Sequence, residues 1–455
     1  MEFRFPLSNR LGFPASRGRS PRKGRCVLPQ RISLQLFTAL FLVTSSVAVV
    51  TAQDPDAAPA AESAGDGTNL ADLLDIKINE HVKVKLGAGA RISLRATENG
   101  AENGSNWSED VNLDNLRLYL SASAYDWFGL EFNTDIGNAQ GFEDAGSGFE
   151  EAGNLRVLDA VGKIEPCDYF KLWFGRFLPP SDRANLSGPF FTTVWDFPYT
   201  QFGYYNIFQG RDDGVAIWGE MSKDELQFGQ LKWQLGAFEG QSGRGATDPN
   251  DDDNTMFTGR LVLNLWDEEP GYYNSSTYYG DKDILALGLA GMHQEDATGI
   301  QGAEEDYTGF SFDVLMEKKL TADVVGNMAG LTDGVVTIDA AYYNFDDGDS
   351  SQVDPGGVFT PVTRQGESWF VTLAYLVPSE INCGVISGQL QPYYRHLNYN
   401  RDVDVAGTTG EGHDFGLNFI LKGHAARLTL AYQTRDGGPQ TATSDQFLLG
   451  AQLNF

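Results

Sequence analysis

Cysteine is scarce in this chain, and so are histidine and long apolar runs. Three of the 455 residues are cysteine, too few for the disulfide framework of a stapled secreted fold. The five histidines show no spacing typical of metal ligands, and the sequence has no nucleotide-binding or nucleophile-elbow motif. We therefore expect no enzyme activity, no cofactor and no metal. Beyond residue 50 no run approaches the ~18 apolar residues of a membrane-spanning helix, so insertion into a membrane would require strands.

Positive charge is also in short supply. Basic residues number 33 against 62 acidic ones, and the formal net charge is −29. Residues 1–52 hold eight of the basic residues and one of the acids, so the rest of the chain carries 25 basic and 61 acidic residues. A chain this acidic cannot bind nucleic acid by neutralising phosphates, which excludes nucleic acid as a partner.

The amino-terminal region has the order of a secretory signal. Eight basic residues within the first 31 positions precede an apolar stretch over 34–50, and small residues follow it. We predict a signal peptide over 1–52; a single membrane anchor is the alternative, although threonine and serine dilute the apolar stretch. Residues 53–80 are rich in Ala, Pro, Asp and Gly, which predicts a periplasmic tether. Within it, residues 69–76 can form two turns of helix.

From residue 82 onward, apolar and polar side chains alternate with a period of two, the pattern of strands with two different faces. About sixteen segments of this kind can be counted. They are 82–96, 113–125, 129–137, 154–164, 169–177, 213–221, 227–238, 256–266, 283–293, 307–317, 334–345, 367–377, 388–398, 413–421, 426–434 and 445–455. In the last segment Phe447, Leu449, Ala451, Leu453 and Phe455 share one face, and the terminal aromatic ring suits an interfacial girdle.

The connections between these segments alternate in length. Short turns such as 126–127 follow even-numbered segments, whereas long, acidic, glycine-rich connections such as 138–153, 294–306 and 399–412 follow odd-numbered ones. Long surface loops, short periplasmic turns and an even strand number are features of outer-membrane barrels. The connection 267–282 departs from the rule, because it is long where a short turn is expected.

A soluble β-sandwich is the alternative fold for any single segment. Such a sandwich rarely extends to about 375 residues as one domain. We therefore predict an all-β fold in which residues 81–455 form a 16-stranded antiparallel transmembrane β-barrel. One face of each strand would contact outer-membrane lipid, and the other would line a water-filled lumen.

Several segments resemble the phosphate-selective porin O/P family of Gram-negative outer membranes. The matching pieces are Asn115-Leu-Arg-Leu-Tyr-Leu-Ser-Ala-Ser-Ala-Tyr-Asp-Trp127, Gly175-Arg-Phe-Leu-Pro-Pro180, Arg211-Asp-Asp-Gly-Val215, Gly416-Leu-Asn-Phe419 with Tyr432, and the terminal strand. The resemblance covers most of residues 81–455. It implies a 16-stranded barrel, a homotrimer, and a third surface loop, here roughly 178–212, that folds inward and narrows the pore.

The basic residues on the polar faces of the strands are the candidate pore lining. They are Lys83, Lys85, Arg91, Arg95, Arg117, Arg260 and Arg427. Because barrel closure makes the last strand a neighbour of the first, most of them would form one basic wall. An acidic loop facing this wall would set up a transverse field that orients polar solutes. The alternative is that these side chains merely pair with acids on the next strand.

The candidate constriction residues lie in or beside the third loop. They are Asp182, Arg183, Asn185, Asp196, Asp212 and Asp213. Where the phosphate-selective family carries lysine and paired serines, this chain has Asn185-Leu-Ser-Gly-Pro189, so both anion and cation passage stay open. Aromatic residues over 190–208 can either stack on sugars or pack the loop against the wall.

The leading functional hypothesis is a porin exported to a Gram-negative outer membrane. It would be a passive channel for small hydrophilic solutes or ions, including anions such as phosphate. The first alternative is a non-conducting scaffold or adhesin that acts through acidic surface loops. The second is a barrel enzyme with a nucleophile on its exterior, but no histidine stands near a serine in a recognisable motif.

Overall fold

The computed structural model describes most of the chain beyond residue 74. The described residues are 75–79, 81–135, 155–198, 210–240, 252–300, 303–321, 332–346, 348, 365–384, 386–401, 409–436 and 444–455. The predicted signal peptide and most of the predicted tether lie outside them. So do residues 199–209 of the expected constriction loop.

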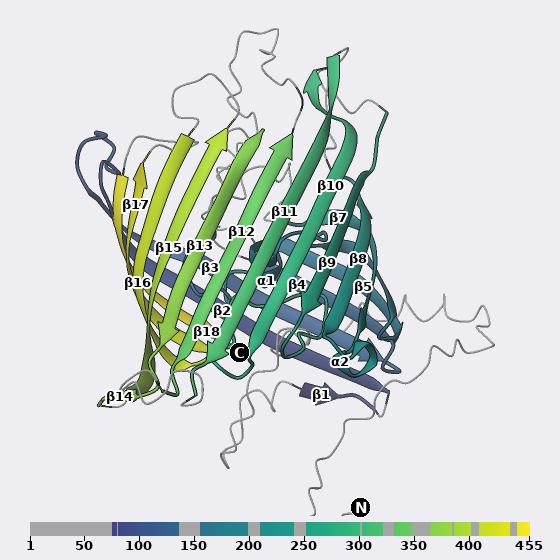
Figure 1. The fold of residues 1–455 in the computed structure, drawn as a ribbon, viewed down its shortest axis with the longest axis horizontal. Coiled ribbons are helices and arrows are strands. Elements are labelled where there is room, and N and C mark those ends of the chain that lie inside the picture. Colours follow the sequence, from purple (N-terminus) through teal and green to yellow (C-terminus); the bar gives the residue numbers. More distant parts are fainter. Residues whose placement is uncertain are drawn as a thin grey trace, which may run out of the picture.

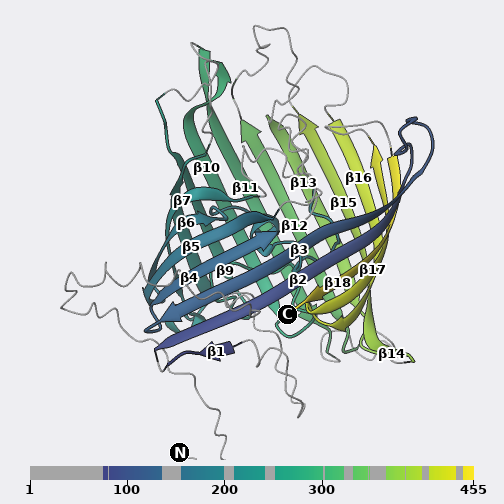
Figure 2. The same ribbon diagram turned by 180° about the vertical axis from the view of Figure 1, so that it is seen from behind.

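Sixteen long antiparallel strands form one closed barrel. The strands are strongly tilted, as Figures 1 and 2 show from opposite sides. They are β2 (Val82–Thr97), β3 (Ser108–Ala124), β4 (Phe128–Asp135), β5 (Arg156–Cys167), β6 (Phe170–Phe177), β7 (Asp212–Met221), β8 (Gln230–Phe238), β9 (Met256–Asn264), β10 (Ile284–Ile300), β11 (Ala303–Lys319), β12 (Val335–Asp346), β13 (Gly366–Leu376), β15 (Ile386–Arg401), β16 (Thr409–Lys422), β17 (Ala426–Asp436) and β18 (Ser444–Asn454). Each pairs with the next, and β18 closes the barrel on β2 from Gln446↔Thr97 to Asn454↔Gly89. The predicted 16-stranded antiparallel barrel is confirmed, and the inward fold of its third loop stays a prediction.

Three short elements lie next to these strands. Strand β14 (Glu380–Cys383) pairs with the start of β15, and α2 (Lys223–Leu226) occupies the turn between β7 and β8. Helix α1 (Arg183–Ser187) follows β6. Among the described residues, no helix is long and apolar enough to span a membrane.

The short helix expected over 69–76 is wrong at its carboxyl end. Asp75–Lys77 form strand β1, which pairs antiparallel with residues 83–85 of β2. Pairing with a long existing strand satisfies the backbone groups that an isolated two-turn helix would leave open at its ends. The long loop expected over 294–306 is also largely strand, because β10 and β11 continue as a hairpin up to the pair Ile300↔Ala303.

The two faces of the wall differ in the way that the alternation predicts. On β18, Leu449 is 50% exposed, whereas its neighbour Leu448 is 1% exposed. On β2, Ile92 is half exposed while Arg91 beside it is buried. Because adjacent residues of a strand point to opposite faces, the apolar row lies outside the barrel and the charged row inside. This is the reverse of a soluble sandwich, which would bury its apolar rows.

The inner face also holds a cluster of aromatic rings. Trp173 of β6 stacks on Tyr272 with ring centroids 4.6 Å apart, and Trp218 of β7 meets both rings edge to face. Phe177 packs against the same tyrosine. All four are fully buried. Since Tyr272 belongs to the connection between β9 and β10, that connection lies against the inner wall.

Candidate functional site

The candidate site is built where two connecting segments meet the inner wall of the barrel. We call them the 178–198 segment, which follows β6, and the 265–283 segment, which joins β9 to β10. Both make hydrogen bonds with inward-facing side chains of several strands. The contacts of the basic residues with these segments define the site.

Four predicted pore-lining arginines lie on neighbouring strands. Arg91 and Arg95 stand on β2, Arg117 on β3 and Arg427 on β17, and β18 lies between β17 and β2. All four side chains are buried on the inner face. Because β18 pairs with β2, the closure of the barrel brings the four arginines onto neighbouring strands. Side chains alternate between the two faces of a strand, and these four all lie on the inner one.

Two of these arginines bind the backbone of the 178–198 segment. Arg91 donates one hydrogen bond to the carbonyl of Trp195 and another, of 2.9 Å, to the side chain of Asn115. Its guanidinium also lies 4.2 Å from the centre of the Trp195 ring. Arg427 donates to the carbonyl oxygens of Thr192 and Thr193 at 2.5 and 3.3 Å. Neutral carbonyls satisfy these donors without cancelling their charge.

Arg95 is paired with carboxylates. It donates to both oxygens of Asp196 at 2.8 and 3.0 Å and to Asp114 at 3.2 Å. Burial by itself would raise the pKa of Asp196, but the adjacent Arg95 outweighs burial and holds this pKa well below its ordinary value. Asp196 is therefore in contact with the basic wall. The expectation that this aspartate faces the wall across an open pore is wrong.

The remaining predicted basic residues lie apart from this cluster. Lys83 is near the short-turn end of β2, where its amine lies 3.4 Å from Asp126 in an exposed pair. Lys85, two residues further along β2, is half-buried. Arg260 of β9 forms an ion pair of 2.6 Å with Asp313 of β11 across β10. Gly288 of β10 permits this pair, because a Cβ there would lie 2.4 Å from Asp313 and 2.6 Å from Arg260.

The start of the 178–198 segment is held by a capped helix. The Asp182 carboxylate accepts a hydrogen bond of 2.9 Å from the Ala184 amide, as an N-cap does, and another of 2.7 Å from the Tyr343 hydroxyl. The Asn185 side chain donates to the Ser181 hydroxyl at 2.8 Å. Both predicted constriction residues thus support the local backbone.

Arg183 joins the two connecting segments. Its guanidinium donates to both oxygens of Glu269 at 2.8 and 2.7 Å and to the carbonyl of Ser275 at 2.7 Å. Burial by itself would raise the pKa of Glu269, but the facing Arg183 lowers it to about 2. Tyr272 donates to the Leu178 carbonyl at 2.9 Å, which adds a second link between the segments.

Asp212 and Asp213 are not part of a free loop. Both belong to β7, where the Asp213 carboxylate accepts two hydrogen bonds from Arg176 of the adjacent β6, at 2.7 and 2.5 Å. The Asp212 carboxylate accepts hydrogen bonds from the Gly240 and Asp213 amides at 2.7 and 2.8 Å. These two acids therefore stabilise the ends of β6 and β7 in the barrel wall.

Two aromatic side chains of the 178–198 segment are packed against the wall. Phe190 and Trp195 are buried, and each ring lies over an inner-face glycine. A Cβ at Gly89 of β2 would come within 2.7 Å of the Phe190 ring, and one at Gly450 of β18 within 2.7 Å of the Trp195 ring. For these two rings the structure favours packing over stacking on sugars. The aromatic residues over 199–208 lie outside the described residues.

Sequence reasoning missed several charged partners on the inner face. Arg395 of β15 pairs with Asp414 of β16 at 2.6 Å and donates to the backbone carbonyl of Asp196 at 2.8 Å. Arg435 of β17 reaches the same Asp414 at 2.6 Å. Their place on the polar face of their strands is visible in the sequence, but their partners depend on strand register.

Comparison with solved structures supports the barrel. OmpF of Salmonella typhi, in a complex with daunomycin, is 12% identical over 84% of this chain and 100% of that chain, with a TM-score of 0.51. The trimer form of OmpT, an outer membrane protein of Vibrio cholerae, is 12% identical over 83% of this chain and 100% of that chain, with a TM-score of 0.48. No protein-family model and no curated protein matches the sequence. Similarity at this level of identity shows the fold alone.

Proposed function

We propose that the protein is an outer-membrane porin, a passive channel for small hydrophilic solutes or ions in an envelope of the Gram-negative type. The observation that carries the proposal is the two-faced wall of a closed barrel, apolar outside and charged inside. Such a wall is stable when lipid surrounds it and water enters it. Export through a signal peptide over 1–52 and contact with outer-membrane lipid belong to the same proposal.

The 178–198 segment is the proposed constriction. It is attached to the inner face at Arg91, Arg95 and Arg427, and its two buried rings fit over glycines of β2 and β18. The 265–283 segment supports it from the other side through the Arg183–Glu269 pair. A pore narrowed in this way excludes large solutes by size and acts on small ones through charge.

The charge around this constriction favours anions. Six arginines, with four aspartates that pair with them, gather where the 178–198 segment meets β2, β3, β15, β16 and β17. They are Arg91, Arg95, Arg117, Arg395, Arg427 and Arg435, with Asp114, Asp135, Asp196 and Asp414. The excess is positive, so small anions such as phosphate are the proposed preferred solutes. The resemblance to the phosphate-selective family does not decide this preference, because the stretch 185–189 lacks that family's lysine and paired serines.

The assembly is proposed to be a homotrimer. This rests on the family resemblance, together with an apolar outer face that can contact either lipid or another copy of the chain. Chemical cross-linking of the protein in mild detergent should yield a ladder that ends at three chains. A ladder that ends at one chain would remove this part of the proposal.

Single-channel recording tests the channel itself. The purified protein, inserted in a planar bilayer, should produce discrete steps of current in potassium chloride. A Glu269→Gln variant separates a closed channel from a protein that does not conduct, because it breaks the link between the two segments. Steps in either protein support the proposal. Absence of steps in both favours the alternative, a scaffold or adhesin acting through the acidic surface loops.

A further inference from the structure

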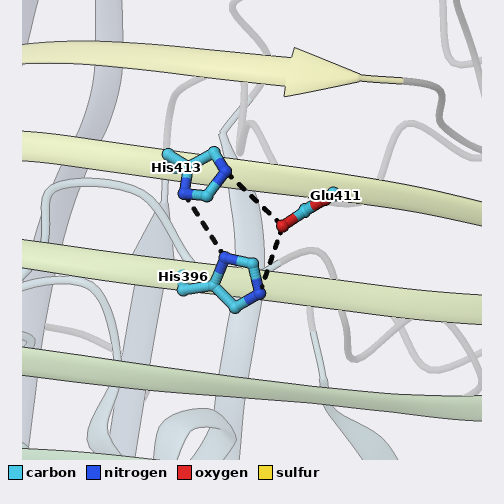
Figure 3. Close-up of side chains that lie close together, drawn as sticks. All are labelled: His396, Glu411 and His413. Carbon is cyan, nitrogen blue, oxygen red and sulfur yellow. Dashed lines mark hydrogen bonds and ion pairs between the residues drawn. The ribbon is translucent and has the colours of Figure 1, made fainter.

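Two histidines and a glutamate meet on the barrel wall (Figure 3). His396 belongs to β15, and Glu411 and His413 belong to β16. The strand register places His396 directly opposite His413. The Nε2 atom of each histidine lies 3.6 Å from the same carboxylate oxygen of Glu411, and the two Nδ1 atoms are 3.3 Å apart. Within the described residues this is the single group of three or more such side chains able to share a metal ion.

The cluster faces outward. Arg395 and Leu397, the neighbours of His396 on β15, are buried on the inner face, so His396 points to the outer one. The side chains of His396, His413 and Glu411 are 19%, 35% and 52% exposed, which leaves the group accessible. The site is therefore separate from the proposed channel, and the inference does not depend on that function.

We propose that His396, Glu411 and His413 bind a divalent transition-metal ion of the zinc type. Metal–ligand bonds of about 2.1 Å at tetrahedral angles place the ligand atoms about 3.4 Å apart. The two distances of 3.6 Å between Glu411 and the Nε2 atoms are close to this value, and one ligand atom from each residue lies within 4.8 Å of the others. Two imidazoles and one carboxylate suit Zn²⁺, Ni²⁺ or Cu²⁺, whereas Mg²⁺ and Ca²⁺ prefer oxygen ligands. Three protein ligands leave one coordination position for water or another oxygen donor.

The surrounding side chains orient the ligands. The Tyr394 hydroxyl lies 2.8 Å from Nδ1 of His413, so this ring can bind the ion through Nε2 while its Nδ1–H donates to the tyrosine. The Trp369 ring packs 4.8 Å from the His396 ring. The facing Nδ1 atoms are 3.3 Å apart, so one can donate a hydrogen bond to the other. An ion bound at both Nε2 atoms would leave a hydrogen on both Nδ1 atoms, so the His396 ring would have to turn slightly to separate them.

The place of the cluster along the strands makes it reachable from water. His396 lies five residues before the end of β15 and Glu411 two residues after the start of β16, beside the connection 402–408. This is the end of the barrel that carries the long connections. A glutamate carboxylate facing lipid is costly in the hydrocarbon layer and tolerated near the interface. The site therefore belongs at the level of the lipid headgroups.

The test is Zn²⁺ binding to the full barrel in detergent, prepared without a histidine tag. Equilibrium dialysis followed by elemental analysis should give one zinc per chain. His396→Ala and His413→Ala should each abolish this binding, and Tyr394→Phe should weaken it about tenfold to a hundredfold. His293→Ala is the matched control, since His293 also faces outward and contacts Thr308 rather than a second histidine. Its binding should equal that of the unchanged protein.

Two results would overturn the inference. One is a protein that takes up no zinc at millimolar concentration. The other is uptake that persists in His396→Ala and His413→Ala, which would place the ion elsewhere. Circular dichroism confirms that each variant retains its strands. Because Trp369 lies beside His396, quenching of its fluorescence by Cu²⁺ in the unchanged protein, and its loss in Trp369→Phe, gives an independent measure of the location.

Discussion

Arg183 and Glu269 form a buried, two-pronged ion pair between segments that are 86 positions apart in the sequence. The pair joins the 178–198 segment to the 265–283 segment against the inner wall. An isolated charge in such surroundings is costly, so each residue is stable there because the other is present. The two segments therefore hold each other in place.

Glu269→Gln should destabilise the protein by about 3–5 kcal/mol, because it leaves the Arg183 charge buried without its main partner. The 178–198 segment should also become more mobile, which would raise conductance and the noise of the open level. Urea titration in detergent gives the free energy of unfolding, and bilayer recording gives the conductance.

The Arg176–Asp213 pair provides a matched control. Its side chains are 40% and 39% exposed, and the two residues connect adjacent strands rather than the two segments. Asp213→Asn should change the free energy of unfolding by less than about 1 kcal/mol and leave conductance unaltered. Equal effects of the two substitutions would show that burial of the Arg183–Glu269 pair is not what holds the segments.

Gly450→Ala tests whether the Trp195 ring packs against Gly450 of β18. The added methyl group would lie 2.7 Å from the ring, so the ring must move, at a cost of about 1–3 kcal/mol. We expect a larger or less stable single-channel conductance, because the constriction would be displaced from the wall. Gly291→Ala is the control, since its methyl group would meet nothing closer than 3.7 Å. An unchanged Gly450→Ala channel would contradict the packing assigned to Trp195.

The fold could be predicted because the polarity of each strand residue matches the face of the barrel wall on which it lies. Leu448 and Leu449 are the same residue type with opposite exposure, and the alternation of their neighbours shows which one faces out. A period of two, repeated over sixteen segments, determines the number of strands and the two faces of the wall. Strand ends were less predictable, because pairing extends β10 and β11 through a stretch that is polar enough to be a loop.

The partners within the site depend on long-range geometry that residue types do not encode. Arg395 and Asp196 are 199 positions apart in the sequence, and they meet because the 178–198 segment lies against the inner face of β15. The contact between His396 and His413, in contrast, could have been predicted from the sequence. Both lie on predicted strands joined by one loop, and a hairpin centred between 404 and 405 places them opposite each other. Examining each histidine for a spacing along one strand overlooked that register.

His424 predicts a loss of stability at acidic pH. It lies in the turn between β16 and β17, where its ring contacts the Thr277 carbonyl, Phe191 and Tyr279. Burial, followed by the nearby charge of Arg427, lowers its pKa from 6.5 to about 4. Between these values the unfolded chain binds a proton that the folded chain does not. The contribution is therefore complete above pH 6.5 and is lost as the pH falls toward 4.

The expected loss between pH 7 and pH 5 is about 2 kcal/mol, from 1.36 kcal/mol for each unit of pKa difference. Urea titrations of the unchanged protein and of His424→Gln at both pH values measure it. The glutamine variant should show a smaller pH dependence, because the carboxylates that also titrate are common to both proteins. Parallel pH profiles would show that His424 is protonated equally well in the folded barrel.

Arg427 offers the sharpest test of ion preference. It is buried and binds the carbonyl oxygens of Thr192 and Thr193, so its charge persists beside the proposed constriction. Arg427→Gln keeps a donor for these carbonyls but removes the charge. Because the side chain is fully buried, an anion in the lumen would pass at a greater distance, and at about 8 Å in water it would lose about 0.5 kcal/mol of attraction, roughly a twofold change in partition. The reversal potential in a potassium chloride gradient should shift toward cation preference.

Lys83→Gln is the control, because it removes the same charge at the exposed rim, where Lys83 faces Asp126, and it should leave the reversal potential unchanged. If both variants shift it equally, total charge rather than the arginine cluster sets the preference.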